Sequence, residues 1–134
     1  MSEDDNLTGV WEGLYNWPGR RPPTPFTAVL IDTGGSLSGS VHEIAQGGPF
    51  EGRELTAMLS GACSGRSVKF TKSYEAKPVR FRPVTYEGSL NDDATEIAGA
   101  WTIRGGMSGR FVMMRSKRPA EAVEARKEEL IPVE

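Results

Sequence analysis

Hydrophobic and polar positions alternate along most of this chain, in short runs bounded by glycine, proline and small polar residues. In residues 37–43, for example, Leu37 and Val41 fall on one side of an extended chain, and Ser38 and His42 fall on the other. This period of two predicts strands with one buried face. Eight such runs follow one another, at residues 7–15, 26–32, 37–43, 55–63, 67–74, 84–90, 96–104 and 109–115.

The links between these runs are too short to hold crossover helices, so we expect consecutive strands to pair antiparallel. A meander of this length normally closes on itself, because closure removes its unpaired edges. The predicted fold is therefore all-β, an eight-stranded antiparallel up-and-down barrel over residues 7–116, after a disordered N-terminus at 1–6. Residues 117–134 are rich in Ala, Glu, Lys and Arg, and Pro119 suits a first helical turn, which predicts a short C-terminal helix.

The links differ in length, which predicts one closed and one open end of the barrel. Short links suit tight hairpins, whereas long loops frame a mouth and are more often functional. Because the two kinds alternate over the first six links, a meander gathers the long ones at the same end, where only the last link, at residues 105–106, is short. The short turns are residues 34–35, 64–66 and 91–95, and the long loops are residues 16–25, 44–53 and 75–83.

Basic residues gather in the loops of the predicted mouth. The short turns carry mostly acidic residues, so a nearly neutral chain is expected to be dipolar, with a positive mouth that concentrates anions. The alternative is ordinary solvated loop charge. The mouth residues are Arg20, Arg21, Arg53, Lys77, Arg80, Arg82 and Arg104, against Glu51 and Glu75.

Composition narrows the possible functions. The net charge is −2, from 16 basic and 18 acidic residues, which does not suggest a nucleic-acid partner. No apolar stretch is long enough to cross a membrane, and the acidic start at residues 1–6 does not resemble a secretory signal, so we expect a cytoplasmic protein. Cys63 is the only cysteine and cannot form an internal disulfide, which fits a reducing compartment.

Several segments resemble the calycin-type barrels, which include lipocalins, fatty-acid-binding proteins and avidins. Residues 9–11 read Gly-Val-Trp, a G-x-W at the start of the first strand, and Arg115 ends the last strand. The order Leu-Thr-Gly-x-Trp, followed by Leu-Ser-Gly-Ser-Val at 37–41, is most similar to the avidin and streptavidin branch. The later segments at 86–88, 97–101 and 108–111 resemble small bacterial lipocalin-like domains. The resemblance covers residues 7–115 and implies an eight-stranded barrel.

The ligands of these relatives do not carry over. The positions that bind biotin in the avidins correspond to Gly13, Val41 and Glu43, which lack the needed groups or add a carboxylate. Haem, which some related barrels hold through an inner histidine, is not expected, because His42 is the only histidine and points outward by parity. We expect no cofactor and no metal.

The inner face near the mouth holds the candidate ligand-binding residues. Aromatic walls with a few fixed polar groups are the usual composition of a small-molecule site. A small anionic or amphipathic molecule is the expected ligand. Trp11 and Arg115 are expected to be structural, with the guanidinium stacked on the ring and bonded to nearby carbonyls. The predicted ligand-binding residues are Tyr15, Trp17, Glu43, Lys72, Tyr74, Arg82, Tyr86 and Trp101.

Three further interpretations stay open at this point. Glu43 and Lys72 could form an internal ion pair, because buried charges are usually paired. Glu43 with a tyrosine such as Tyr86 could instead perform acid–base chemistry, as in phenolic acid decarboxylases, which resemble this barrel in using inner Tyr, Arg and Glu. Thirdly, an outward apolar stripe predicts an interaction surface and a homodimer. That stripe is formed by Val10, Leu14, Val29 and Ile31, with Met113 or Met114.

Overall fold

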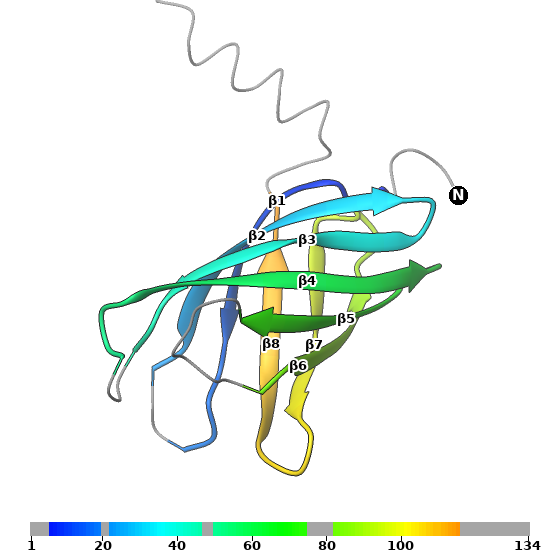
Figure 1. Ribbon diagram of the computed structural model, residues 1–134. Helices are drawn as coiled ribbons and strands as arrows, with labels where there is room; N and C mark the ends of the chain where they lie inside the picture. The colour runs from blue at the N-terminus through cyan, green and yellow to red at the C-terminus, as the bar shows by residue number, and fades with distance from the viewer. Residues whose placement is uncertain (1–5, 20–21, 47–49, 75–81, 116–134) are drawn as a thin grey trace, which may run out of the picture.

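The computed structural model describes residues 6–19, 22–46, 50–74 and 82–115, and within them the chain forms one closed antiparallel barrel (Figure 1). Each strand pairs with its neighbours in the sequence, so the chain is a simple meander. The strands are β1 (Gly9–Tyr15), β2 (Thr24–Thr33), β3 (Ser36–Ile44), β4 (Glu54–Ser64), β5 (Ser67–Tyr74), β6 (Val84–Leu90), β7 (Glu96–Ile103) and β8 (Ser108–Met114).

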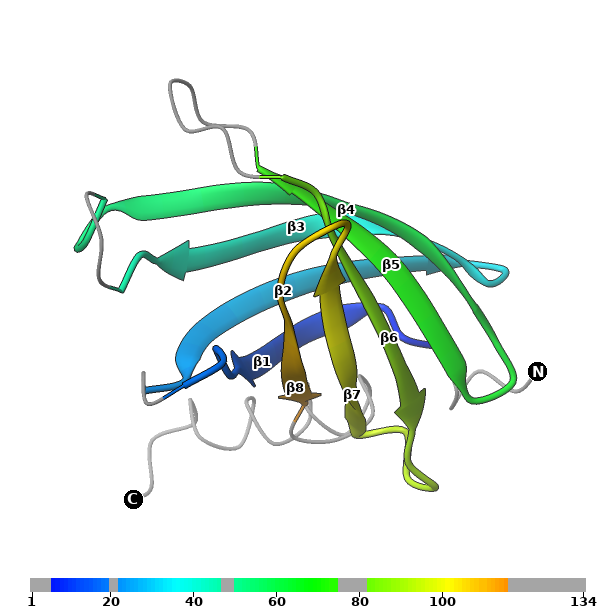
Figure 2. The same cartoon turned by 90° about the horizontal axis from the view of Figure 1, so that it is seen from below.

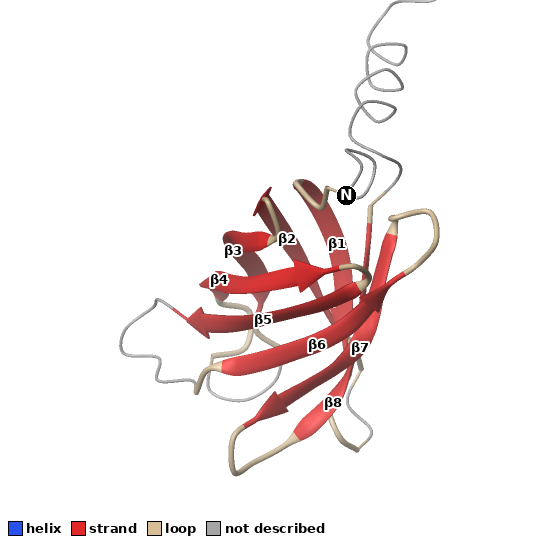
Figure 3. Ribbon diagram, turned by 90° about the vertical axis from the view of Figure 1, so that its right-hand side faces the viewer, coloured by secondary structure: helices blue, strands red, loops and turns tan. Residues whose placement is uncertain are grey.

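The barrel closes where β1 pairs with β8. This seam runs from Glu12 opposite Met114 to Tyr15 opposite Phe111 and is antiparallel like the other pairings. The predicted all-β, eight-stranded up-and-down barrel is therefore confirmed. Figure 3 shows no helix among the described residues. The predicted C-terminal helix and the predicted disordered N-terminus lie almost wholly outside those residues.

Two strand boundaries differ from the prediction in an informative way. β1 begins at Gly9 rather than Leu7, because the Leu7 amide is bonded to the Asp32 side chain and not to a strand. β2 begins at Thr24 and contains Pro25. At Pro25 the strand pairs only with β1, opposite Leu14, so the missing amide hydrogen of proline removes no bond to β3.

The long connections lie at one end of the barrel, together with the short β7–β8 link, and the other short links lie at the opposite end. In Figure 1 the β1–β2 and β3–β4 connections lie at the left, and the β2–β3 and β4–β5 hairpins lie at the right; Figure 2 shows the same division from below. The last residues of β1, β3, β5 and β7 thus surround one end of the barrel. We call this end the mouth and the other the closed end.

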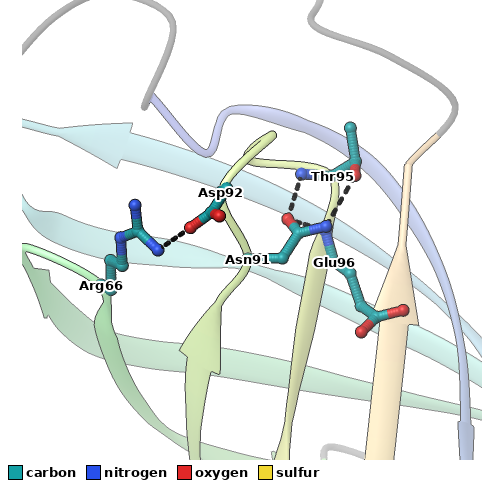
Figure 4. A network of polar contacts seen from close by, with 5 residues as sticks. All are labelled: Arg66, Asn91, Asp92, Thr95 and Glu96. Atoms are coloured by element: carbon teal, nitrogen blue, oxygen red, sulfur yellow. Dashed lines mark hydrogen bonds and ion pairs between the residues drawn. The ribbon is translucent and has the colours of Figure 1, made fainter.

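The hairpin between β6 and β7 closes its end of the barrel with side-chain bonds (Figure 4). The Asn91 side-chain oxygen accepts from the backbone amides of Thr95 and Glu96 at 2.8 and 2.9 Å. The neighbouring β4–β5 hairpin is tied to it by an ion pair between Arg66 and Asp92. Side chains that mimic backbone turns in this way favour a tight link over a long loop.

Trp11 and Arg115 fill the closed end. The Arg115 guanidinium carbon lies 4.7 Å from the centre of the Trp11 ring, and the indole nitrogen donates to the Leu7 carbonyl at 2.9 Å. Arg115 also donates to the carbonyls of Ala94 at 2.9 Å and Asn6 at 2.9 Å. These bonds join the end of β8 to the segment before β1 and to the β6–β7 hairpin.

Asp32 is buried at the closed end, although it lies next to the short turn at residues 34–35. Its carboxylate accepts from the Leu7 and Gly35 amides at 3.0 and 2.9 Å. The Cys63 thiol lies 3.6 Å from the same carboxylate. Because burial removes water from this group, backbone amides must take its place.

No helix in the described parts of the chain is long and apolar enough to span a bilayer.

Candidate functional site

A buried polar cluster lies just inside the mouth. It is formed by Glu43 from β3 and Lys72 from β5, with the three tyrosines of the chain, Tyr15, Tyr74 and Tyr86, around them. Glu43 and Lys72 are only 5% and 2% exposed. Charged groups at this depth are costly unless they are paired and hydrogen-bonded.

Glu43 accepts three hydrogen bonds, each from a different side chain. Its Oε1 atom accepts from Lys72 Nζ at 3.0 Å and from the Tyr74 hydroxyl at 2.7 Å. Its Oε2 atom accepts from the Tyr15 hydroxyl. The internal ion pair between Glu43 and Lys72 is therefore present, and both carboxylate oxygens have a protein donor.

Three aromatic rings surround the Lys72 ammonium. The Nζ atom lies 4.8 Å from the ring centre of Tyr15, 4.7 Å from that of Tyr74 and 5.3 Å from that of Tyr86. Each distance is within the range at which a cation is attracted to a ring face. The ammonium is thus held by one carboxylate and three rings.

The pairing of β4 with its two neighbours, β3 and β5, brings Glu43 and Lys72 together. β4 lies between β3 and β5, and its inward residues nearest the mouth are Leu55, Ala57 and Leu59. Leu55 is opposite Glu43, and Leu59 is opposite Lys72. Ala57, between them, has the smallest side chain of the three, which leaves room above β4 for the two long side chains to meet.

Aromatic packing fixes the wall of the mouth on the other side. The Trp101 indole nitrogen donates to the Asn16 carbonyl at 3.0 Å. A β-carbon at Gly109, opposite Trp101 on β8, would lie 2.6 Å from that nitrogen, so glycine is required for this approach. The Trp17 ring lies 5.6 Å from both the Tyr15 and Trp101 rings, in edge-to-face arrangements.

Trp17 and Tyr74 are only partly buried and form the outer layer of the site. The Trp17 indole nitrogen donates to the Thr24 hydroxyl at 3.1 Å. Beneath the polar cluster, the Phe70 and Tyr86 rings are stacked at 4.9 Å, and the Tyr86 and Phe111 rings meet edge-to-face at 4.9 Å. These three rings are buried and fill the interior of the barrel beneath the cluster.

All three tyrosines are held in the protonated form. Burial raises the pKa of Tyr15 and of Tyr74 far above the ordinary value, and the charge of Glu43 raises both further. Burial also raises the pKa of Tyr86, although the Lys72 ammonium opposes this effect. At neutral pH these phenols are therefore hydrogen-bond donors.

The structure brings most of the predicted ligand-binding residues together, but not all of them. Tyr15, Glu43, Lys72, Tyr74 and Tyr86 form the cluster, and Trp17 and Trp101 flank it. Arg82 lies outside it: this side chain is exposed and donates to the Arg104 carbonyl at 3.2 Å.

Thr24 and Asn16 support the site but were not predicted to do so. Thr24 is buried and accepts from Trp17, and Asn16 contributes only its backbone carbonyl. A hydroxyl next to a tryptophan-containing loop was the one sequence signal for Thr24, and a backbone acceptor leaves no signal at all. His42 is exposed on the outer face, and in the described residues no group of three acidic, histidine or cysteine side chains could hold a metal ion.

No protein-family model matches this sequence, and no curated protein matches it significantly.

Proposed function

We propose that this protein binds a small amphipathic anion at the rim of the mouth. The observation that carries the proposal is the buried Glu43–Lys72 pair beneath the half-buried Trp17 and Tyr74. A barrel that needed only stability could replace such a pair with apolar residues at no cost, or with a gain. Buried polar groups beside an aromatic surface at a barrel mouth are the usual composition of a ligand site.

The anionic group of the ligand would contact the rim and not the interior. Lys72 is already neutralised by Glu43, and the carboxylate of Glu43 would repel a second anion. Arg53, Arg82 and Arg104 are exposed in the mouth connections and would attract an anion. The apolar part of the ligand would then stack on Trp17 and Tyr74.

A matched pair of arginine variants tests this proposal. We would titrate the protein with 2-naphthoate and follow tryptophan fluorescence, with the neutral amide of the same ring as a reference. Arg82→Glu should weaken naphthoate binding several-fold at low ionic strength and less at high ionic strength. Arg66→Glu changes the same charge at the closed end and should have no effect. Absence of saturable binding, or equal loss in both variants, would refute the proposal.

An acid–base enzyme is a second candidate, favoured by the 2.7 Å bond between Tyr74 and Glu43. A protonated phenol that is hydrogen-bonded to a carboxylate can instead donate its proton to a bound substrate. The test is incubation with a panel of phenolic acids, with CO₂ release as the readout. Turnover that is lost in Tyr74→Phe supports an enzyme, and absence of turnover counts against it.

A homodimer is a separate proposal that rests on the outer face. Val10, Val29 and Met114 are exposed there, and Val10 is opposite Val29 on the adjacent strand. A second copy that covers this face would remove apolar surface from water. Light scattering should give a dimer that Val10→Lys converts to a monomer. A monomer at high concentration of the unmodified chain would contradict it.

A further inference from the structure

The groups around Lys72 are those that recognise a ligand ammonium. A carboxylate oxygen lies 3.0 Å from Nζ, and three tyrosine rings surround it at 4.7 to 5.3 Å. Proteins bind alkylammonium and methylated ammonium ligands with the same combination of ring faces and a counter-charge. Here the cation belongs to the chain itself.

The three tyrosine rings form a cage around the Lys72 ammonium, and an ion pair alone does not require such a cage. Lys69 and Glu87 form a second Lys–Glu pair between β5 and β6, with nitrogen and oxygen 3.2 Å apart. Both of these side chains are about two-thirds exposed, at 68% and 64%, and lie on the outside of the barrel. The inner pair instead draws on β1, β3, β5 and β6, so four strands contribute to holding one ammonium.

We propose that the interior of the mouth is an ammonium-binding site of which Lys72 is the built-in occupant. The chemical class that the site accepts is a small primary alkylammonium. In the unmodified protein Lys72 fills the site, so an external ammonium finds it occupied. Removing the lysine side chain while keeping Glu43 and the rings would leave the site vacant.

The proposal is tested by chemical rescue of Lys72→Ala with n-propylammonium, which supplies the atoms that the substitution removes. We expect saturable binding by isothermal titration calorimetry and a rise in the thermal midpoint. Neither effect should occur with equal amounts of n-propanol or sodium chloride. Lys69→Ala is the matched control and should show no rescue, because its partner Glu87 lies in water without a cage.

Two further variants identify the groups that bind. Adding Glu43→Gln to Lys72→Ala should abolish rescue, because the counter-charge is lost. Adding Tyr74→Leu should weaken n-propylammonium binding about tenfold, whereas Tyr74→Phe, which keeps the ring, should weaken it less.

A failure to fold also decides the matter. If Lys72→Ala is unfolded alone, refolding that depends on n-propylammonium supports the site. The proposal is overturned if n-propylammonium stabilises Lys72→Ala no more than sodium chloride does, while Lys72→Met folds in the absence of n-propylammonium. It is also overturned if Lys69→Ala responds equally.

Discussion

Tyr74 and Lys72 donate to the same oxygen of Glu43, at 2.7 and 3.0 Å. A carboxylate oxygen that accepts from both a phenol and an ammonium is fully satisfied inside the barrel. The cluster is therefore a closed unit, in which loss of Glu43 would leave the Lys72 ammonium buried without a counter-charge.

Glu43→Gln should strongly destabilise the barrel. The substitution leaves the Lys72 ammonium buried without a counter-charge, which costs about 3–5 kcal/mol in comparable cases. Urea denaturation measures the change in free energy of unfolding. Glu87→Gln, which breaks the exposed pair with Lys69, should cost less than about 1 kcal/mol. Similar losses of unfolding free energy in the two variants would show that burial of the Glu43–Lys72 pair does not set the cost.

The tyrosines should not ionise in the folded protein near pH 10. An unfolded chain releases its phenolic protons there, while the folded chain keeps them, because the folded pKa values of Tyr15, Tyr74 and Tyr86 are raised. The stability that this contributes is complete below pH about 10 and is lost as the pH rises further.

Absorbance at 295 nm measures this ionisation directly, since the chain has 3 tyrosines and all are in the cluster. We expect no step near pH 10 in buffer, a single step when the barrel unfolds at higher pH, and an ordinary titration in urea. A step of one tyrosine near pH 10 in the folded protein would show that one ring is more accessible than the structure has it.

Cys63 should react slowly with alkylating reagents. Burial, and then the charge and hydrogen bonding of Asp32, raise the pKa of the thiol from 9.0 to about 11. The thiolate is the reactive form, so alkylation followed by mass spectrometry should accelerate with pH up to about 11. The same measurement in urea gives the reference, where the midpoint should return to the ordinary range. A folded midpoint at or below 9 would exclude the proposed effect of Asp32.

Arg115→Lys should weaken the closed end although it preserves the charge. A lysine can stack over Trp11 but cannot donate to Ala94, Thr8 and Asn6 at once, as the guanidinium does. Bonds from a charged donor contribute enough that a loss of about 2 kcal/mol is expected. Thermal unfolding measures it, and Arg110→Lys, an exposed position on β8, is the control.

The fold could be predicted from the sequence because alternation and loop length are local signals. The buried positions of Trp11, Val41, Phe70 and Ile97 all follow from parity. The start of β2 could not be found, because Pro25 suggests a loop unless its pairing with β1 alone is known.

The site was only partly predictable for a different reason. Parity gives the face of a strand, so Glu43 and Lys72 could be placed inside the barrel. It does not give depth or strand tilt, and these bring the Tyr15 and Tyr74 hydroxyls onto one carboxylate. The burial of Asp32 could not be predicted, because an acidic residue beside a Gly-Gly turn suggests a surface position, whereas backbone amides hold it inside.

The bond between Arg115 and the Asn6 carbonyl has a practical consequence. It brings the two limits of the barrel to the same place, opposite the mouth. A fluorescent protein or a resin joined directly at Asn6 or at Arg115 would therefore be attached at the closed end, away from Trp17 and Tyr74. Samples immobilised through either of these two positions should consequently keep the rim accessible.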